Sequence, residues 1–342
     1  MISAQLIGSE GPLAEVFDVA LCDLDGVTFA GTEPIAHAAQ GIAEARDQGM
    51  RFNFLTNNAS RSPEEVVRHL KSVGIKAKPS EIYTASQAGA AMVADDFPKG
   101  TKVLAVGGSS LATALKQVGL VPVSSALDEP AAVLQGFGPN VGWTLLAEAT
   151  YAINQGAAYY ATNLDATLPT ERGFAPGNGS LVAAVSRATG VEPRSAGKPE
   201  PALFLAVAGR ARAKSVIVLG DRLETDIAGA LNAGLYAMLV MTGVTTPTLV
   251  LQAPPACRPH FIALDLRGLG ETHPPPRREG EWWVVGTARA RLGPSGPELG
   301  AWGTAADRLR AAATLAWTLD DDGSRLSDSD LTKLVALLGE SG

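Results

Sequence analysis

The stretch "LCDLDGVTFAG", residues 21–31, begins in an apolar run and then places two aspartates, Asp23 and Asp25, on either side of one leucine. Gly26 follows directly. Charged side chains are rarely found at the buried end of a strand unless they are paired or bind an ion. Side chains two residues apart point to the same side of an extended strand, so both carboxylates are expected to face one site. The stretch therefore predicts a strand that ends at a functional centre.

Apolar runs of strand length alternate with helical patterns along most of the chain, which is typical of βα units and a largely parallel sheet. One helix is expected over 62–74, where Ser62, Pro63 and Glu65 form a capping-box pattern, and another over 180–190, ending at Gly190. The expected strands are "EVFDVALCD" (15–23), "MRFNFLTNN" (50–58), "TKVLAVGG" (101–108), "AAVLQGF" (131–137), "AAYYATN" (157–163), "SVIVLGD" (215–221) and "LYAMLVMTG" (235–243).

Composition excludes several classes of function. The chain has 342 residues, 46% of them hydrophobic, which is enough for sizeable cores in about two domains. A net charge of −7 offers no broad basic face for nucleic acid. The two cysteines, Cys22 and Cys257, lie far apart and form neither a thiolate zinc motif nor a disulfide framework. With no apolar run of about 18 residues and no leader pattern, we expect a cytoplasmic protein without a membrane partner.

Three of the expected strands end in polar side chains that a buried core would not favour. These are Asp23 and Asp25 after the first strand, Thr56, Asn57 and Asn58 after the second, and Asp221 and Asp226 after the sixth. Ligands of open parallel sheets bind beyond the carboxyl ends of the strands, so the three groups are expected to converge on one site.

Four converging carboxylates would repel one another, by roughly 4 kcal/mol for each pair about 4 Å apart at an effective dielectric constant near 20. A hard dication with oxygen ligands would compensate, and Mg²⁺ is the expected cofactor. Lys198, in the loop "SAGKPEP", is a second candidate cation that could reach a phosphoryl oxygen. Taken alone, Asp226 is more typical of a helix cap or turn residue than of a ligand, and only the joint set of polar strand ends favours the functional interpretation.

The motifs "DLDGV" (23–27), "LTNN" (55–58), "GKPEP" (197–201) and "GDRLETD" (220–226), in this order, resemble the four motifs of the haloacid dehalogenase (HAD) superfamily. The resemblance covers roughly residues 12–268. The segment "ATNLDATLPTERGFAPGNGSLVAAV" (161–185) is similar to the cap segment of the NagD-like branch, which contains nitrophenylphosphatase-type, phosphoglycolate and glycerol-3-phosphate phosphatases.

The resemblance implies a role for each motif residue. Asp23 would be the nucleophile that forms an aspartyl-phosphate, and Asp25 the acid that protonates the leaving alkoxide and then activates water. Lys198 is the third expected catalytic residue. The substrate-binding set is Gly26, Thr56, Asn57 through its backbone N–H, Asn58, and, in the cap, Asn163 and Asp165. The Mg²⁺ ligands would be Asp23, the Asp25 carbonyl, Asp221 and, directly or indirectly, Asp226.

About 140 positions separate Thr56 from Lys198, far more than one βα crossover needs, so an inserted domain is expected there. The expected fold is α/β: a Rossmann-like HAD core in two parts (1–79 and 191–271), an α/β cap (80–190) and a linker with a small α+β C-terminal extension (272–342). In the cap, Asn163 and Asp165 either contact substrate or cap the following loop. The glycine-rich "PGNGS" is interpreted as a helix start in preference to an anion site.

The extension begins with the proline-rich "THPPPRREGEWW" (272–283). Residues 281–292 are expected to form one strand, and 304–321 and 327–338 two helices. Four tryptophans, Trp282, Trp283, Trp302 and Trp317, demand burial, so the extension should pack on the core or on a second subunit. A homo-oligomer through the cap or the extension is compatible with the sequence.

A large cap over the site would admit only small substrates. The resemblance therefore implies a Mg²⁺-dependent phosphatase for a small phosphorylated metabolite. Glycerol 3-phosphate, from glycerophospholipid breakdown, is the expected substrate. The alternatives are 2-phosphoglycolate, another small phosphomonoester, or a non-catalytic sensor or interaction protein that retains the fold.

Overall fold

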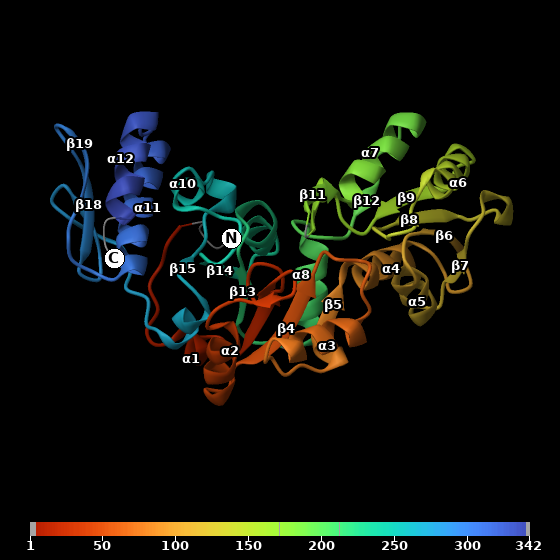
Figure 1. Cartoon of the computed structure of the whole chain (residues 1–342), viewed down its shortest axis with the longest axis horizontal. Coiled ribbons are helices and arrows are strands. Elements are labelled where there is room, and N and C mark those ends of the chain that lie inside the picture. The colour runs from red at the N-terminus through yellow and green to blue at the C-terminus, as the bar shows by residue number, and fades with distance from the viewer. Residues whose placement is uncertain (1–4, 171, 212, 340–342) are drawn as a thin grey trace. The chain divides into compact units, whose positions relative to one another are not determined.

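The computed structural model of the chain describes residues 5–170, 172–211 and 213–339 (Figure 1). The chain divides into two compact units, which are described separately: unit 1 comprises residues 1–52 and 208–342, and unit 2 comprises residues 53–207. The chain passes from unit 1 to unit 2 within strand β4 (Arg51–Thr56) and returns within helix α8 (Pro201–Arg210). The predicted cap, residues 80–190, lies inside unit 2, and its limits stay a prediction.

Unit 1 is built around parallel strands that follow the order β15-β14-β13-β1. Every residue of β1 and β13 is buried, because a parallel sheet is covered on both faces, and this explains their uninterrupted apolar sequences. The strands are β1 (Val19–Asp23), β13 (Val216–Gly220), β14 (Tyr236–Val240) and β15 (Phe261–Ala263). The flanking helices are α1 (Leu13–Val16), α2 (Ala38–Asp47), α9 (Ala228–Asn232) and α10 (Pro247–Leu251).

Unit 2 contains a five-stranded parallel sheet in the order β12-β9-β8-β6-β7. Alternate side chains of its strands enter two separate cores: Leu104 packs with α6 and α7, whereas its neighbour Val103 packs with α4 and α5. Helices therefore cover both faces of this sheet. Its elements are α4 (Ala85–Asp96), β6 (Lys102–Val106), α5 (Ser109–Gln117), β7 (Val121–Val123), β8 (Ala132–Gln135), α6 (Trp143–Asn154), β9 (Ala158–Ala161), α7 (Asn178–Thr189) and β12 (Arg194–Ser195).

The remaining elements of unit 2 confirm both helix predictions. In α3 (Pro63–Ser72), the Ser62 side chain accepts from the Glu65 N–H and the Glu65 side chain accepts from the Ser62 N–H. Gly190 ends α7 in the left-handed conformation, at φ 72°. The other strands are β5 (Ile82–Thr84), which pairs in parallel with β4, and the antiparallel pair β10 (Thr167–Thr170) and β11 (Gly173–Pro176).

Each of the seven predicted strands contains an observed strand, but residues 15–16 belong to helix α1 instead of the first strand. In the extension, the single strand predicted over 281–292 is wrong. Gly286, at φ 57°, begins a two-residue turn that divides it into β17 and β18. The extension contains an antiparallel sheet, β16 (Arg277–Glu279), β17 (Trp282–Val285), β18 (Ala288–Gly293) and β19 (Gly296–Leu299), and helices α11 (Ala305–Asp321) and α12 (Asp328–Gly339). The short strands β2 (Phe29–Ala30) and β3 (Glu33–Pro34) complete unit 1.

Helix α11 anchors the extension to the rest of unit 1 through buried polar contacts. The Trp317 Nε1–H donates to the Val250 carbonyl at 2.8 Å, and the Arg310 Nε–H donates to the Ile262 carbonyl at 2.8 Å. Arg258, which lies outside the extension, pairs with Asp320 at 2.8 Å and Asp321 at 2.6 Å. These contacts bear out packing on the core, one of the two expected alternatives. The expectation that all four tryptophans are buried is wrong for Trp302, which is 77% exposed.

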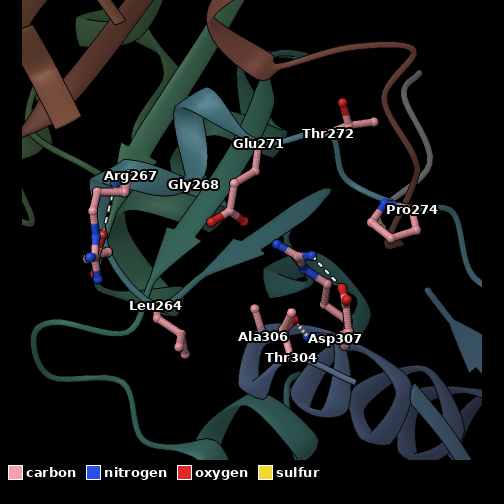
Figure 2. Close-up of a pocket in the computed structure, with 11 residues that line it drawn as sticks. Leu264, Arg267, Gly268, Glu271, Thr272, Pro274, Thr304, Ala306 and Asp307 are labelled. Atoms are coloured by element: carbon pink, nitrogen blue, oxygen red, sulfur yellow. Dashed lines mark hydrogen bonds and ion pairs between the residues drawn. The ribbon is translucent and has the colours of Figure 1, made fainter. Parts of the chain in front are cut away.

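The proline-rich segment predicted to begin the linker (272–283) also contacts the rest of unit 1. The His273 N–H donates to the Ser9 hydroxyl, and the His273 ring is buried against Phe261 and lies 2.9 Å from the Gly268 carbonyl. Beside it, a cavity of about 440 Å³ is lined by residues 264–274 and by the first turns of α11 (Figure 2). Among the helices in the described ranges, none combines the length and the apolar character needed to cross a bilayer.

Replacing Trp317 by alanine is expected to lower the free energy of unfolding by about 3–5 kcal/mol, because the ring is buried and the Val250 carbonyl would lose one of its donors. Trp302, which is 77% exposed, provides the matched control: Trp302→Ala should change stability by less than about 0.5 kcal/mol. Urea unfolding of both variants measures the difference. Equal effects would contradict the assignment of Trp317 as an anchor.

A second prediction concerns acid stability. Burial, assisted by the nearby positive charge of Arg310, lowers the pKa of His273 to about 4. The unfolded state therefore binds the proton more tightly, so the stability due to neutral His273 is complete above pH about 6.5 and is lost as pH falls towards 4. His273→Gln should flatten the decline in unfolding free energy over this window, by at most about 3 kcal/mol. Urea titrations of the wild type and of His273→Gln across this window measure the difference, and equal slopes would contradict the role assigned to His273.

Candidate functional site

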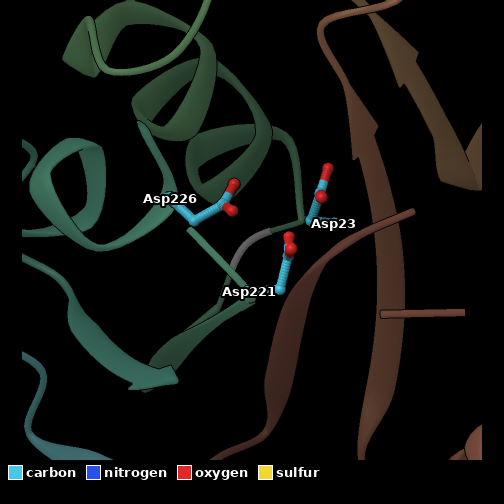
Figure 3. A group of neighbouring side chains, drawn as sticks. All are labelled: Asp23, Asp221 and Asp226. Carbon is cyan, nitrogen blue, oxygen red and sulfur yellow. The ribbon is translucent and has the colours of Figure 1, made fainter. Parts of the chain in front are cut away.

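Three aspartates of unit 1 meet at the carboxyl ends of two adjacent strands. Asp23 is the last residue of β1, Asp221 directly follows β13, and Asp226 lies in η3 (Leu223–Ile227), a π-helical turn. Because β1 and β13 pair in parallel, their carboxyl ends lie at the same edge of the sheet. One carboxylate oxygen from each residue lies within 4.8 Å of the others (Figure 3). We call these three residues the aspartate cluster.

Backbone N–H groups hold two members of the cluster. The Val244 N–H donates to Asp221 Oδ2 at 2.7 Å, and the Arg222 N–H donates to Asp226 Oδ2 at 3.2 Å. Asp221 and Asp226 are buried, with 0% and 1% of their surface exposed. These backbone N–H donors carry no net charge. They therefore leave in place the repulsion between the carboxylates of the cluster. The cluster is therefore suited to a bound cation.

Glycines let the chain approach these carboxylates closely. A Cβ atom on Gly26, which has φ +86°, would lie 2.5 Å from Asp221 Oδ2, and one on Gly243 would lie 1.9 Å from the same atom. The Gly26 carbonyl accepts from the Thr242 hydroxyl at 2.6 Å, which ties the loop after β1 to the segment after β14. The space beside Asp221 thus exists only because two positions lack side chains.

The residues present fit a magnesium ion. Carboxylate oxygens are the hard ligands that Mg²⁺ prefers, and Asp23, Asp221 and Asp226 would hold it. Asp25 is exposed, and its carboxylate is not among the three that gather here, in keeping with the prediction that its carbonyl is the ligand. The metal-binding and acid–base roles of Asp25 stay predictions.

In unit 2, the polar residues after β4 form a tight turn. Thr56, the last residue of the strand, accepts from the Asn58 N–H through its hydroxyl at 3.0 Å. Asn58 in turn accepts from the Ser60 N–H at 2.9 Å. These local bonds stiffen the turn and present its backbone in one conformation.

Four predicted site residues of unit 2 form a hydrogen-bonded group, which we call the amide network: Asn57, Asn163, Asp165 and Lys198. The Asn163 side chain donates to the Asn57 carbonyl at 2.7 Å, and Asn57 Nδ2 donates to the Asp165 carboxylate at 3.1 Å. The Asp165 N–H donates to Asn163 Oδ1 at 3.2 Å, so Asn163 does cap its loop. Contact of Asn163 or Asp165 with substrate stays a prediction.

The glycine-rich segment "PGNGS" (176–180) contains the start of helix α7, as interpreted. The Gly177 and Gly179 N–H groups donate to the carbonyls of Ala166 and Asp165, both at 2.9 Å, which leaves neither donor for an anion. Asn178, the first residue of α7, is buried and donates to the Asn163 carbonyl at 2.8 Å.

Sequence reasoning missed Gly243, Val244, Asn178 and Gly197 as parts of these two groups. A signal existed for the first two, because "TGV" (242–244) spans the end of the strand predicted over 235–243. Asn178 and Gly197 gave no such signal, since their partners lie in other loops of unit 2.

Two family models match the chain. Residues 20–121 match haloacid dehalogenase-like hydrolases, and residues 195–269 match a HAD-hydrolase-like model. Among curated proteins, a D-glycerol 3-phosphate phosphatase of Mycobacterium tuberculosis is 45% identical over 257 residues, which cover 75% of this chain and 72% of the relative. An acid sugar phosphatase of Staphylococcus haemolyticus is 40% identical over 228 residues, covering 66% and 86%.

Solved structures give the same result. A glycerol phosphate phosphatase from M. tuberculosis, crystallised with calcium, matches with a TM-score of 0.82 and 39% identity, over 93% of this chain and 92% of its own. The same protein with magnesium matches with a TM-score of 0.80, over 89% and 92%. A thermostable NPPase double mutant from Geobacillus stearothermophilus has a TM-score of 0.67 and 33% identity, over 73% and 97%. The 93% match extends into the C-terminal extension.

The glycine beside Asp221 can be tested for its effect on the cation. Gly26→Ala should weaken Mg²⁺ binding by at least about tenfold, because the added methyl group would displace the Asp221 carboxylate. Gly31→Ala is the matched control: Gly31 also has positive φ, +63°, but nothing lies within 4 Å of its added Cβ. Both variants carry the backbone strain, and only the first should lose affinity in calorimetric titration with Mg²⁺. Equal affinities would exclude a metal site at the aspartate cluster.

Proposed function

Because this chain belongs to the haloacid dehalogenase-like hydrolase family, we propose that it is a Mg²⁺-dependent phosphatase that hydrolyses a small phosphate monoester. The observation that carries the proposal is the aspartate cluster, in which the carboxylates of Asp23, Asp221 and Asp226 lie close enough together to bind a single ion. A bound Mg²⁺ would neutralise charge on the cluster and on the phosphate, as it does in other phosphoryl-transfer sites. The relative solved with magnesium supports the choice of ion.

Glycerol 3-phosphate is the proposed substrate, released as glycerol and phosphate. Its support is the 45% identity with a D-glycerol 3-phosphate phosphatase and the structural match to a glycerol phosphate phosphatase that extends into the C-terminal extension. A small acidic sugar phosphate is the second candidate, because relatives at 40% identity are named acid sugar phosphatases. 2-Phosphoglycolate remains the alternative that the resemblance alone suggested.

The proposed reaction has two steps. Asp23 attacks phosphorus, the bond to the glycerol oxygen breaks, and Asp25 donates a proton to the leaving alkoxide. Asp25 then removes a proton from water, which attacks the aspartyl-phosphate and frees Asp23 and inorganic phosphate. The position of Asp23 supports its role, because it is 9% exposed and belongs to the aspartate cluster. Asp25 is exposed, so its carboxyl is accessible to a leaving alkoxide and to water.

For unit 2, the proposal carries over the roles that the family assigns to matching motif positions. Thr56, the Asn57 N–H and Lys198 would hold the phosphoryl oxygens, and residues 80–190 would form the cap that restricts substrate size. The stiff turn after β4 and the burial of Lys198 support a preorganised binding group. We also propose a cytoplasmic enzyme, in keeping with Cys22 and Cys257, which form no disulfide.

Asp23→Asn should reduce turnover of glycerol 3-phosphate by about 10³-fold or more, because an amide cannot form the aspartyl-phosphate. Phosphate release with Mg²⁺ present measures the loss, and circular dichroism checks that the fold is kept. A wild-type chain that releases no phosphate from any small monoester would leave the non-catalytic alternative in place.

Asp25→Asn serves as the comparison. Loss of a general acid should cost about 10²–10⁴-fold with glycerol 3-phosphate but much less with 4-nitrophenyl phosphate, whose leaving group needs no proton. If Asp23→Asn turned over substrate at the wild-type rate, the assignment of Asp23 as the nucleophile would be wrong.

A further inference from the structure

We propose that the side chain of Asn57 is a positioning residue for Lys198: its amide fixes the Lys198 backbone and thereby places the ammonium group against the substrate phosphate. The inference rests on the proposed function of Lys198 as a phosphate-binding cation. It concerns the Asn57 side chain, whereas the role carried over from the family belongs to the Asn57 backbone N–H.

The amide of Asn57 contacts Lys198 at two points. The Lys198 N–H donates to Asn57 Oδ1 at 3.0 Å, and Asn57 Nδ2 donates to the Lys198 carbonyl at 3.2 Å. A single bond would let the loop pivot, but two bonds to the groups on either side of one Cα atom fix both flanking peptides. The side-chain amide thus acts on Lys198 as the backbone of a neighbouring strand would.

Asp165 determines which way the amide faces. Its two carboxylate oxygens lie 3.1 Å and 3.2 Å from Asn57 Nδ2. A carboxylate needs a donor and the Lys198 N–H needs an acceptor, so only one orientation of the amide satisfies both partners. An aspartate, a serine or an aliphatic residue at position 57 cannot supply both groups in this geometry.

Gly197 makes the close approach sterically feasible. A Cβ atom at this position would lie 2.9 Å from Asn57 Oδ1 and 2.5 Å from the Thr162 carbonyl. Lys198 itself is 5% exposed, so its side chain has few alternative rotamers and its ammonium position follows the backbone. A shift of about 1 Å in a group that contacts the reacting phosphate can cost about 100-fold in rate.

The test is a double-mutant cycle on phosphate release from glycerol 3-phosphate and from 4-nitrophenyl phosphate, with Mg²⁺ present. Asn57→Ala should lower kcat/KM by about 10- to 100-fold. If Asn57 acts through Lys198, adding Asn57→Ala to Lys198→Ala should cause no more than about a twofold further loss. Gly197→Ala, which pushes the same contact apart from the other side, should behave like Asn57→Ala.

Two further variants separate positioning from general loss of stability. Gln135→Ala removes another buried amide of unit 2, one whose side chain accepts from the Tyr159 hydroxyl, so its effect should be additive with Lys198→Ala. In Asn57→Asp, the new carboxylate lies opposite the carboxylate of Asp165, and the two charges repel each other. The exchange Asn57→Asp with Asp165→Asn restores an amide–carboxylate pair and an acceptor for the Lys198 N–H, but not the donor to the Lys198 carbonyl, so it should recover only part of the activity that Asn57→Asp loses.

Hydrogen exchange gives a readout that does not depend on turnover. The peptide containing Lys198 should exchange faster in Asn57→Ala, because the Lys198 N–H loses its acceptor, but not in Gln135→Ala. Additive losses in the cycle would overturn the positioning role. Unchanged exchange in Asn57→Ala would overturn it even if the chain hydrolyses no phosphomonoester. Full activity of Lys198→Ala alongside an active wild type would instead refute the proposed role of Lys198.

Discussion

Mutual repulsion among the carboxylates of Asp23, Asp221 and Asp226 is the constraint on which the site in unit 1 depends. Each pair costs several kcal/mol when held about 4 Å apart with little water. The fold nevertheless places them together, at the ends of two adjacent parallel strands, and leaves two glycines where side chains would displace Asp221. Without a bound cation, this repulsion would only destabilise the folded state. The cluster therefore connects the fold directly to the binding of magnesium.

The amide network of unit 2 solves a different problem with the neutral side-chain amide of Asn57, which lies between Asp165 and the Lys198 backbone. Lys198 is buried, and a long side chain is placed accurately only if its backbone is held. Asn57 does this with one side chain that both donates and accepts, and Asp165 selects its orientation. Charge in unit 1 and amide geometry in unit 2 therefore preorganise separate parts of the proposed machinery.

The C-terminal extension is attached by buried polar anchors as well as by apolar packing. Arg258, Arg310 and Trp317 each direct a donor to an acceptor across the junction. Their burial makes the extension part of unit 1. In the proline-rich segment before it, His273 is buried and donates to Ser9, whereas residues 277–281 are exposed. The hairpin of the extension was missed because β17 and β18 form one continuous β-like run interrupted only by Gly286 and Thr287.

By itself, the sequence determined the parallel α/β class, seven strands, the capped helix at 63–72 and the aspartates at the ends of two strands. These follow from local periodicity and from polar residues at strand ends, which neighbours in the chain largely decide. Only the tertiary structure decided the short strands β5, β7 and β15, the closeness of Gly243 to Asp221, and the pairing of Asn57 with Asp165 and Lys198. The reason is physical: three-residue strands carry no period, and contacts between residues more than 100 positions apart depend on how loops are brought together by the packed sheets.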